Sequence, residues 1–134
     1  EPTLDKPAAP GAVTPHNRYN GGPFREPAMP FTDLLARLHA IRDHNAWAPL
    51  HSPKNLAMAA SVEMAELLEV FQWLSEAQSR QLDETQRRQA GAEVADVIFY
   101  LLLLSSELGL DLPQVLQDKL ADNERRFLGA PAHA

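Results

Sequence analysis

Two acidic pairs in this chain have the spacing that places two carboxylates on one side of an α-helix. The pairs are Glu63 with Glu66 and Glu93 with Asp96, and residues three apart on a helix share a face. Both pairs lie in otherwise apolar stretches, so their carboxylates would repel one another and lose hydration near a core. A hard divalent cation with oxygen ligands offsets such a charge, and Mg²⁺ is the usual one. The sequence therefore predicts a Mg²⁺ site formed by four carboxylates, with Mn²⁺ as an alternative ion.

Aromatic and cationic side chains on the same predicted faces indicate a phosphate-ester substrate. Trp73 lies seven residues after Glu66, and Tyr100 lies seven residues after Glu93, so each ring is near the line of one carboxylate. The last predicted helix carries three polar residues on one face: Lys119, Asn123 and Arg126. Carboxylates would hold metal, metal and cations would hold phosphates, and rings would stack on a base. The ordinary alternatives stay open, namely aromatic core residues and solvated surface cations.

The role of Glu69, which continues the face of the first acidic pair, stays open between metal ligand, general base and salt-bridge partner. Glu66 or Glu69 is a candidate base for an attacking water, although four clustered carboxylates titrate as a coupled set. Neither acidic pair has the Glu-x-x-His spacing of di-iron carboxylate bundles. We therefore assign three histidines of the helical region to structural or surface positions: His39, His44 and His51.

The composition argues against several other classes of protein. The chain has 134 residues, which suits one domain, and no cysteine, which excludes disulfides and thiolate metal sites. A net charge of −6 argues against binding to duplex nucleic acid, which depends on basic patches. The longest apolar run, residues 97 to 104, is shorter than the roughly 20 residues that span a membrane. No signal segment opens the chain, so we expect a cytoplasmic protein without a membrane partner.

The chain divides into three parts by composition. Residues 1 to 30 hold seven of the eleven prolines and show no hydrophobic period, which predicts an extended or disordered N-terminal arm. Residues 31 to 128 carry helical periods and form the expected domain. Residues 129 to 134 form a short C-terminal tail.

Four helices are predicted within this domain, and no segment alternates as a strand would. The first begins after Thr32 and ends near Trp47. The second begins at Ser52, a cap residue followed by a first-turn proline, and runs to about Ser79. The third and fourth begin at capping-box patterns. Their limits are Asp83 to Gly109 and Asp111 to Phe127, with the capping glutamines at Gln86 and Gln114.

These elements predict an all-α fold, a four-helix bundle in which the two long middle helices are antiparallel neighbours. The third helix is apolar nearly all round over residues 97 to 104, so it should be buried on every side. Four helices of one chain do not easily cover such a helix. We therefore expect a homo-oligomer, with a dimer as the minimum.

The order of these motifs resembles the MazG-like all-α nucleoside triphosphate pyrophosphatases, and within them the dCTP pyrophosphatase branch. The similarity covers residues 31 to 128 and excludes the N-terminal arm. The resembling stretches are Trp47, His51 to Leu56, Glu63 to Trp73, Glu93 to Tyr100, Asp111 to Pro113, and Lys119 with Asn123 and Arg126.

The resemblance implies Mg²⁺-dependent hydrolysis of a deoxynucleoside triphosphate to the monophosphate and pyrophosphate, with dCTP or a 5-modified dCTP as substrate, in nucleotide-pool sanitation. It also implies a homotetramer built as a dimer of dimers. The implied metal ligands are Glu63, Glu66, Glu93 and Asp96. The implied substrate-binding residues are Trp47 and Trp73 at the base, Tyr100 near the sugar, Lys119, Asn123 and Arg126 at the phosphates, and also Lys54.

Two positions depart from the pattern of that family. His39 falls about one residue away from the register of a base-contacting histidine, and Phe127 with Leu128 stands where Tyr-Pro is common. The alternative function is a non-catalytic nucleotide-binding sensor or interaction module on the same fold. Because all four carboxylate positions are filled, the sequence favours an enzyme over a sensor.

Overall fold

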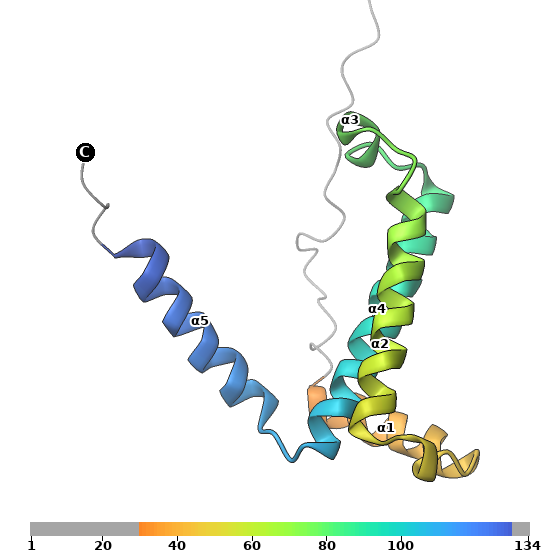
Figure 1. The fold of residues 1–134 in the computed structure, drawn as a ribbon, viewed down its shortest axis with the longest axis vertical. Coiled ribbons are helices and arrows are strands. Elements are labelled where there is room, and N and C mark those ends of the chain that lie inside the picture. The colour runs from red at the N-terminus through yellow and green to blue at the C-terminus, as the bar shows by residue number, and fades with distance from the viewer. Residues whose placement is uncertain (1–29, 130–134) are drawn as a thin grey trace, which may run out of the picture.

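The computed structural model describes residues 30 to 129, and every regular element within that range is helical (Figure 1). The expected all-α fold is therefore confirmed for this part of the chain. The expectations for the N-terminal arm and the C-terminal tail concern residues 1 to 29 and 130 to 134, which lie outside the described range. The elements in chain order are α1 (Phe31–His44), a short 3₁₀ turn (Ala48–Leu50), α2 (Pro53–Phe71), α3 (Glu76–Ser79), α4 (Glu84–Glu107) and α5 (Leu112–Leu128).

Local capping residues start three of these helices where the sequence predicts. The Ser52 hydroxyl accepts a hydrogen bond from the backbone N–H of Asn55 at 3.2 Å, ahead of the first-turn proline of α2. A reciprocal capping box begins α4, in which the N–H of Gln86 donates to the carboxylate of Asp83 at 2.8 Å. The Asp111 carboxylate caps α5. α1 differs, because it begins two residues earlier than expected, with Pro30 and not Thr32 at its N-cap position.

The expected extension of the second helix to Ser79 is wrong, because α2 ends at Phe71. A new capping box lies four residues further along. The Ser75 hydroxyl accepts from the N–H of Gln78 at 3.2 Å, and the Gln78 side chain accepts from the N–H of Ser75 at 2.9 Å. This pair satisfies the first polar groups of a separate helix, α3, and so favours a break over continuation of α2.

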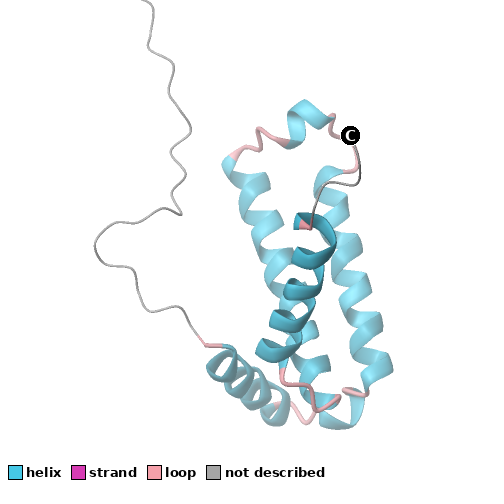
Figure 2. Ribbon diagram, turned by 90° about the vertical axis from the view of Figure 1, so that its left-hand side faces the viewer, coloured by secondary structure: helices cyan, strands magenta, loops and turns pink. Residues whose placement is uncertain are grey.

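α2 and α4 form the centre of the molecule, side by side and antiparallel, in both views (Figures 1 and 2). α1 lies across one end of this pair and packs against α4 (Figure 1). The buried apolar residues of the described part of the chain come from α2 and α4 and lie toward that end: Leu56, Ala60, Leu102 and Leu103. The expected antiparallel pairing of the two middle helices is confirmed, although α3 and its flanking turns replace a single short turn between them.

The fourth helix does not complete a bundle within one chain. α5 extends away from the other helices (Figure 1), and none of its residues is buried. Apolar side chains therefore stay exposed on both α5 and α4, for example Leu120 at 59% and Leu101 at 46%. As expected for one chain alone, residues 97 to 104 are only partly covered, because α2 and α1 pack against only part of α4. Burial of the remainder in an oligomer stays a prediction.

By length and composition, α4 is apolar enough to cross a membrane, with a hydropathy of 1.2 over its most apolar 18 residues. This is weak evidence, because core helices of soluble proteins have the same property. In this structure α4 is the central helix and carries Glu93 and Asp96 midway along its length. The absence of a membrane partner stays a prediction from the sequence.

The exposed apolar faces of α4 and α5 predict self-association. Sedimentation at micromolar concentration should give a mass at least twice the 14.8 kDa of one chain. Leu101→Glu should shift the protein toward smaller species, because it places a charge on the exposed apolar face of α4. The matched control is Glu84→Gln in the exposed first turn of the same helix, which should leave the mass unchanged. A folded monomer of the unmodified protein would contradict the prediction.

Candidate active site

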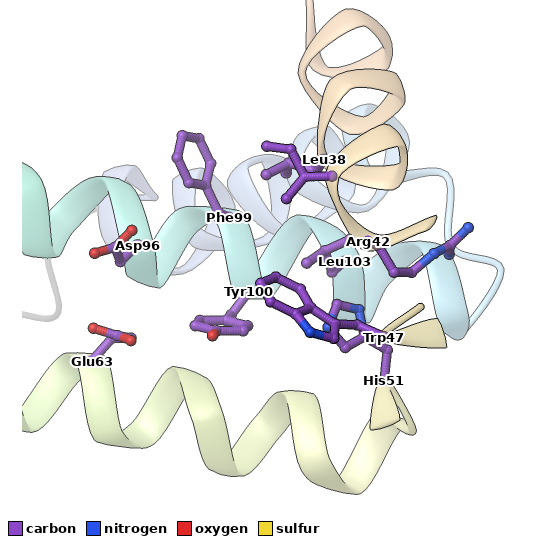
Figure 3. A pocket seen from close by; sticks show the side chains of 10 residues that line it. Leu38, Arg42, Trp47, His51, Glu63, Asp96, Phe99, Tyr100 and Leu103 are labelled. Atoms are coloured by element: carbon purple, nitrogen blue, oxygen red, sulfur yellow. The ribbon is translucent and has the colours of Figure 1, made fainter. Parts of the chain in front are cut away.

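Carboxylates from α2 and α4 meet where the two helices pack side by side. Oxygen atoms of Glu63, Glu66 and Glu93 all lie within 4.8 Å of one another. The i, i+3 spacing places Glu63 and Glu66 on one face of α2, and the antiparallel pairing brings α4 opposite that face. Asp96 is the next acidic residue along α4 and faces Glu63 (Figure 3). Two pairs that lie about 30 residues apart in the sequence are thereby brought together, as their shared spacing predicts.

The electrostatics of this cluster are those of crowded like charges. Burial raises the pKa of Glu63 to about 7, helped by a hydrogen bond with Glu66 and by the charges of Glu66, Asp96 and Glu93. Burial also raises the pKa of Glu93, with the charge of Glu66 as the next cause. The buried Oε2 atom of Glu93 has no hydrogen-bond partner in the described part of the chain. A site with these properties holds either protons or a cation.

The donor set fits a hard divalent cation. It consists of carboxylate oxygens alone, one oxygen is buried and unpartnered, and the mutual repulsion decreases when a positive charge binds. Asp96 lies beside this group of three but not among the oxygens that fall within 4.8 Å of one another. Glu69 lines a second hollow on the other side of the cluster, together with Glu66 and Glu93.

A cavity of about 240 Å³ leads from the acidic cluster toward the end of α1. Figure 3 shows Glu63 and Asp96 facing each other at one end, Trp47 beside His51 at the other, and Tyr100 between. The rings of Trp47 and His51 have centroids 6.4 Å apart and are tilted by 38°. The remaining lining residues are mostly apolar: Leu38, Ile41, Arg42, Phe99 and Leu103. An acidic end and a flat aromatic end thus occupy one cavity, which suits a ligand with a phosphate part and a ring.

Several expected site residues do not line this cavity within one chain. Trp73 is 87% exposed and lies past the end of α2, far along the helix from Trp47. The three polar residues of the last helix lie on α5, which extends away from α2 and α4 (Figure 1) and contributes no residue to the cavity. On α5, Lys119 lies 3.7 Å from Asp122, Arg126 is exposed and Asn123 is half-buried. Lys54 is exposed in the first turn of α2. Their assignment to substrate binding stays a prediction.

The structure adds cavity residues that the sequence reasoning did not assign. His51, taken as structural or surface, lines the cavity, and its Nδ1 atom is buried without a hydrogen-bond partner among the described residues. Arg42 and Phe99 also line it. The four-residue spacing between Trp47 and His51 across a proline-containing turn could have indicated that the two rings lie together.

Comparison with known proteins identifies the group to which this site belongs. The MazG-like family matches residues 58 to 133. dCTP pyrophosphatase 1 of Mus musculus is 32% identical over 126 residues, which cover 92% of this chain and 72% of that protein. The Homo sapiens protein of the same name is 33% identical over 115 residues, covering 84% of this chain and 66% of its own length.

A solved structure gives an independent comparison of the fold. The crystal structure of a pyrophosphatase from Archaeoglobus fulgidus matches with a TM-score of 0.68 and 37% sequence identity. The match covers 72% of this chain and 90% of the archaeal one. Together with an acidic cluster that could hold a metal, typical of this family, these matches show that the chain belongs to the MazG-like family and is a nucleoside triphosphate pyrophosphatase-like hydrolase, homologous to dCTP pyrophosphatase.

Proposed function

We propose that this protein hydrolyses dCTP or a 5-modified dCTP to the monophosphate and pyrophosphate, with Mg²⁺ as the resident cation. The observation that carries the proposal is the cavity with Glu63 and Asp96 at one end and Trp47 at the other, in a homologue of dCTP pyrophosphatase. A triphosphate would extend toward the carboxylates, and the base would lie on the indole. The proposed cellular role is sanitation of the cytoplasmic nucleotide pool.

The carboxylates would hold the cation, and Glu66 or Glu69 would act as the base. Glu63, Glu66 and Glu93 bring their oxygens within 4.8 Å of one another, and Asp96 extends the set into the cavity. A bound divalent cation would supply charge neutralisation for the phosphates and a lowered pKa for water. Glu69 lies beside this group without belonging to it, so its carboxylate is free to accept a proton. The water oxygen would then form a bond to the α- or the β-phosphorus while the phosphoanhydride bond between the two breaks, which gives the monophosphate and pyrophosphate.

The aromatic end of the cavity supports a pyrimidine base. Trp47 is 44% exposed, which leaves one face of its indole ring available for stacking. Apolar neighbours such as Phe99 and Leu38 would accept a 5-methyl group, which is worth about 1 kcal/mol when buried. A flat slot accepts any base by its face, so hydrogen bonds at the edge of the base must decide between bases.

The proposed assembly is a dimer at least, and a tetramer by resemblance. Neither Trp73 nor the cationic face of α5 lines the cavity of its own chain. In an assembly these groups of one copy would approach the cavity of another, where Lys119, Asn123 and Arg126 would meet phosphates. The exposed apolar surface of α4 and α5 supports such an assembly.

A nucleotide panel tests the proposed substrate. With Mg²⁺, kcat/KM should rank dCTP and 5-methyl-dCTP above dUTP, dTTP, dATP and dGTP. Trp47→Ala should raise KM about tenfold with little change in kcat, because about 1–3 kcal/mol of stacking is lost. Trp73→Ala should have a comparable effect if the assembly brings that ring to the base. A purine ranked first would contradict the proposed pyrimidine preference. An unchanged KM for Trp47→Ala would show that the indole does not bind the base.

Turnover should require the carboxylates and a divalent cation. Chelation should abolish activity, and Mg²⁺ or Mn²⁺ should restore it. Glu63→Gln and Asp96→Asn should each lower kcat/KM by about 100-fold, which corresponds to about 2.7 kcal/mol of transition-state stabilisation. The control, Glu84→Gln on the exposed first turn of α4, should keep full activity. Near-native rates for either of the first two variants would remove that residue from the metal site.

The raised pKa of Glu63 predicts how the stability of the metal-free protein depends on pH. Between pH 4.5 and about 7 the folded protein holds a proton on Glu63 that the unfolded chain releases, so the free energy of unfolding falls as pH rises. Glu63→Gln keeps this side chain neutral. The difference in melting temperature, variant minus unmodified protein with chelator present, should therefore grow from pH 5 to pH 8. A constant difference would show that Glu63 does not titrate in this range.

A further inference from the structure

The turn that presents Trp47 to the cavity is a Schellman motif, the usual closure of a helix C-terminus. The N–H of Trp47 donates to the carbonyl of Arg42 at 2.9 Å, and the N–H of Ala46 donates to the carbonyl of Asp43 at 3.2 Å. These are the two hydrogen bonds that define the motif. The motif requires a left-handed residue just before its last position, and Ala46 occupies that place with φ +54°.

An alanine in this position is unusual. Glycine normally fills it, because a Cβ atom makes the left-handed conformation unfavourable. Ala46 is exposed, so burial of its own side chain does not explain the conformation. The strained backbone is held by its surroundings, and such strain is concentrated at functional sites.

Arg42 is the residue that fastens this turn to α4. Its Nε atom donates to the Asp43 carboxylate at 2.7 Å, and its Nη1 atom lies 3.7 Å from the Glu107 carboxylate at the end of α4. The hydrogen bond from Arg42 lowers the pKa of Asp43, so this pair stays charged at neutral pH. Only 18% of the Arg42 side chain is exposed, while its own carbonyl accepts the N–H of Trp47. Arg42 therefore joins the end of α4 to the backbone of Trp47.

A second contact ties α1 to the same end of α4. The side chains of His39 and Ser106 lie 3.3 Å apart, at hydrogen-bond distance. α1 thus meets the last turn of α4 at two points, one residue apart on α4, before the chain reverses into Trp47. The orientation of Trp47 depends on this junction and on the left-handed turn together.

We propose that Arg42 and Ala46 are positioning residues for nucleobase binding, which hold the Trp47 indole over the aromatic end of the cavity. The proposal rests on the proposed function, because it assigns the stacking face of that site. Both residues act through Trp47, so their loss should weaken nucleotide binding while the chemistry at the carboxylates continues. The expected signature is a raised KM at nearly constant kcat.

Two substitutions at Ala46 separate backbone conformation from side-chain contact. Ala46→Gly keeps the left-handed turn without a Cβ atom, so KM should stay unchanged and the melting temperature should stay equal or rise. Ala46→Val places a β-branched residue at positive φ, so the turn should open and KM for dCTP should rise about three- to tenfold, with kcat within about twofold. Equal KM values for the two variants would overturn the proposal.

Glu107→Gln tests the junction from outside the cavity, since Glu107 does not line it. Losing the charge that faces the largely buried Arg42 side chain should raise KM by about two- to threefold, and Glu107→Asp should restore part of the effect. Glu84→Gln on the first turn of the same helix is the control and should leave KM unchanged. If Ala46→Val fails to fold, this pair still decides the question: an unchanged KM for Glu107→Gln then counts against the proposal.

Fluorescence gives a readout that does not need turnover. The chain has two tryptophans, so in a Trp73→Phe background the emission comes from Trp47 alone. Adding Ala46→Val should increase acrylamide quenching of that emission, and adding Ala46→Gly should not. Suppose that Ala46→Val increases the quenching of Trp47 but the unmodified protein hydrolyses no nucleotide. The proposed function is then refuted, and the role of the turn in holding Trp47 is supported. Normal hydrolysis with unchanged quenching and KM in Ala46→Val would refute the positioning role alone.

Discussion

The mutual repulsion of the carboxylates between α2 and α4 is the constraint on which the other features depend. Two antiparallel helices pack with carboxylates facing one another midway along their length, where burial, and then the neighbouring negative charges, raise the pKa values of Glu63 and Glu93. The buried side chains then lie to one side of the cluster, toward α1: Leu56, Ala60, Leu102 and Leu103. The apolar contacts at that end hold the two helices together against the repulsion, and the same end carries the Trp47 turn.

The firmly held aromatic end of the cavity and its charged end therefore lie in different parts of the structure. The indole of Trp47 is fixed by a short turn and by the last residues of α4, where the helices are packed. The carboxylates lie further along, where α2 and α4 have solvent on one side and a cation can enter. A ligand that spans the cavity contacts both the aromatic end and the carboxylates. Different elements of one cavity would therefore bind its ring and its charged part.

Local signals in the sequence were sufficient for much of this description. Ser52, Asp83 and Asp111 cap their helices because each capping hydrogen bond joins residues only three apart. The meeting of the acidic pairs follows from helical periodicity and antiparallel pairing. The end of α2 was missed because a second capping box at Ser75 competes with an uninterrupted apolar period.

Other features depend on contacts between distant residues. His51 lies in the cavity through its position beside Trp47, and no spacing rule for metal ligands marks it. The turn at Ala46 has no glycine, so the residue type that normally indicates a Schellman motif is absent from the sequence. The direction of α5 depends on the connection after Gly109, where φ is +64°, and periodicity says nothing about it.

The uncovered apolar surface has a consequence for the thermodynamics of folding. Part of the apolar surface of α4 stays open to water inside one chain, and no residue of α5 is buried, so the hydrophobic contribution to folding is incomplete there. Any partner that covers it binds the native state and not the unfolded one, and so stabilises the native state by mass action. When the partner is another copy, dilution and denaturation become a single linked equilibrium, and the unfolding midpoint rises with protein concentration.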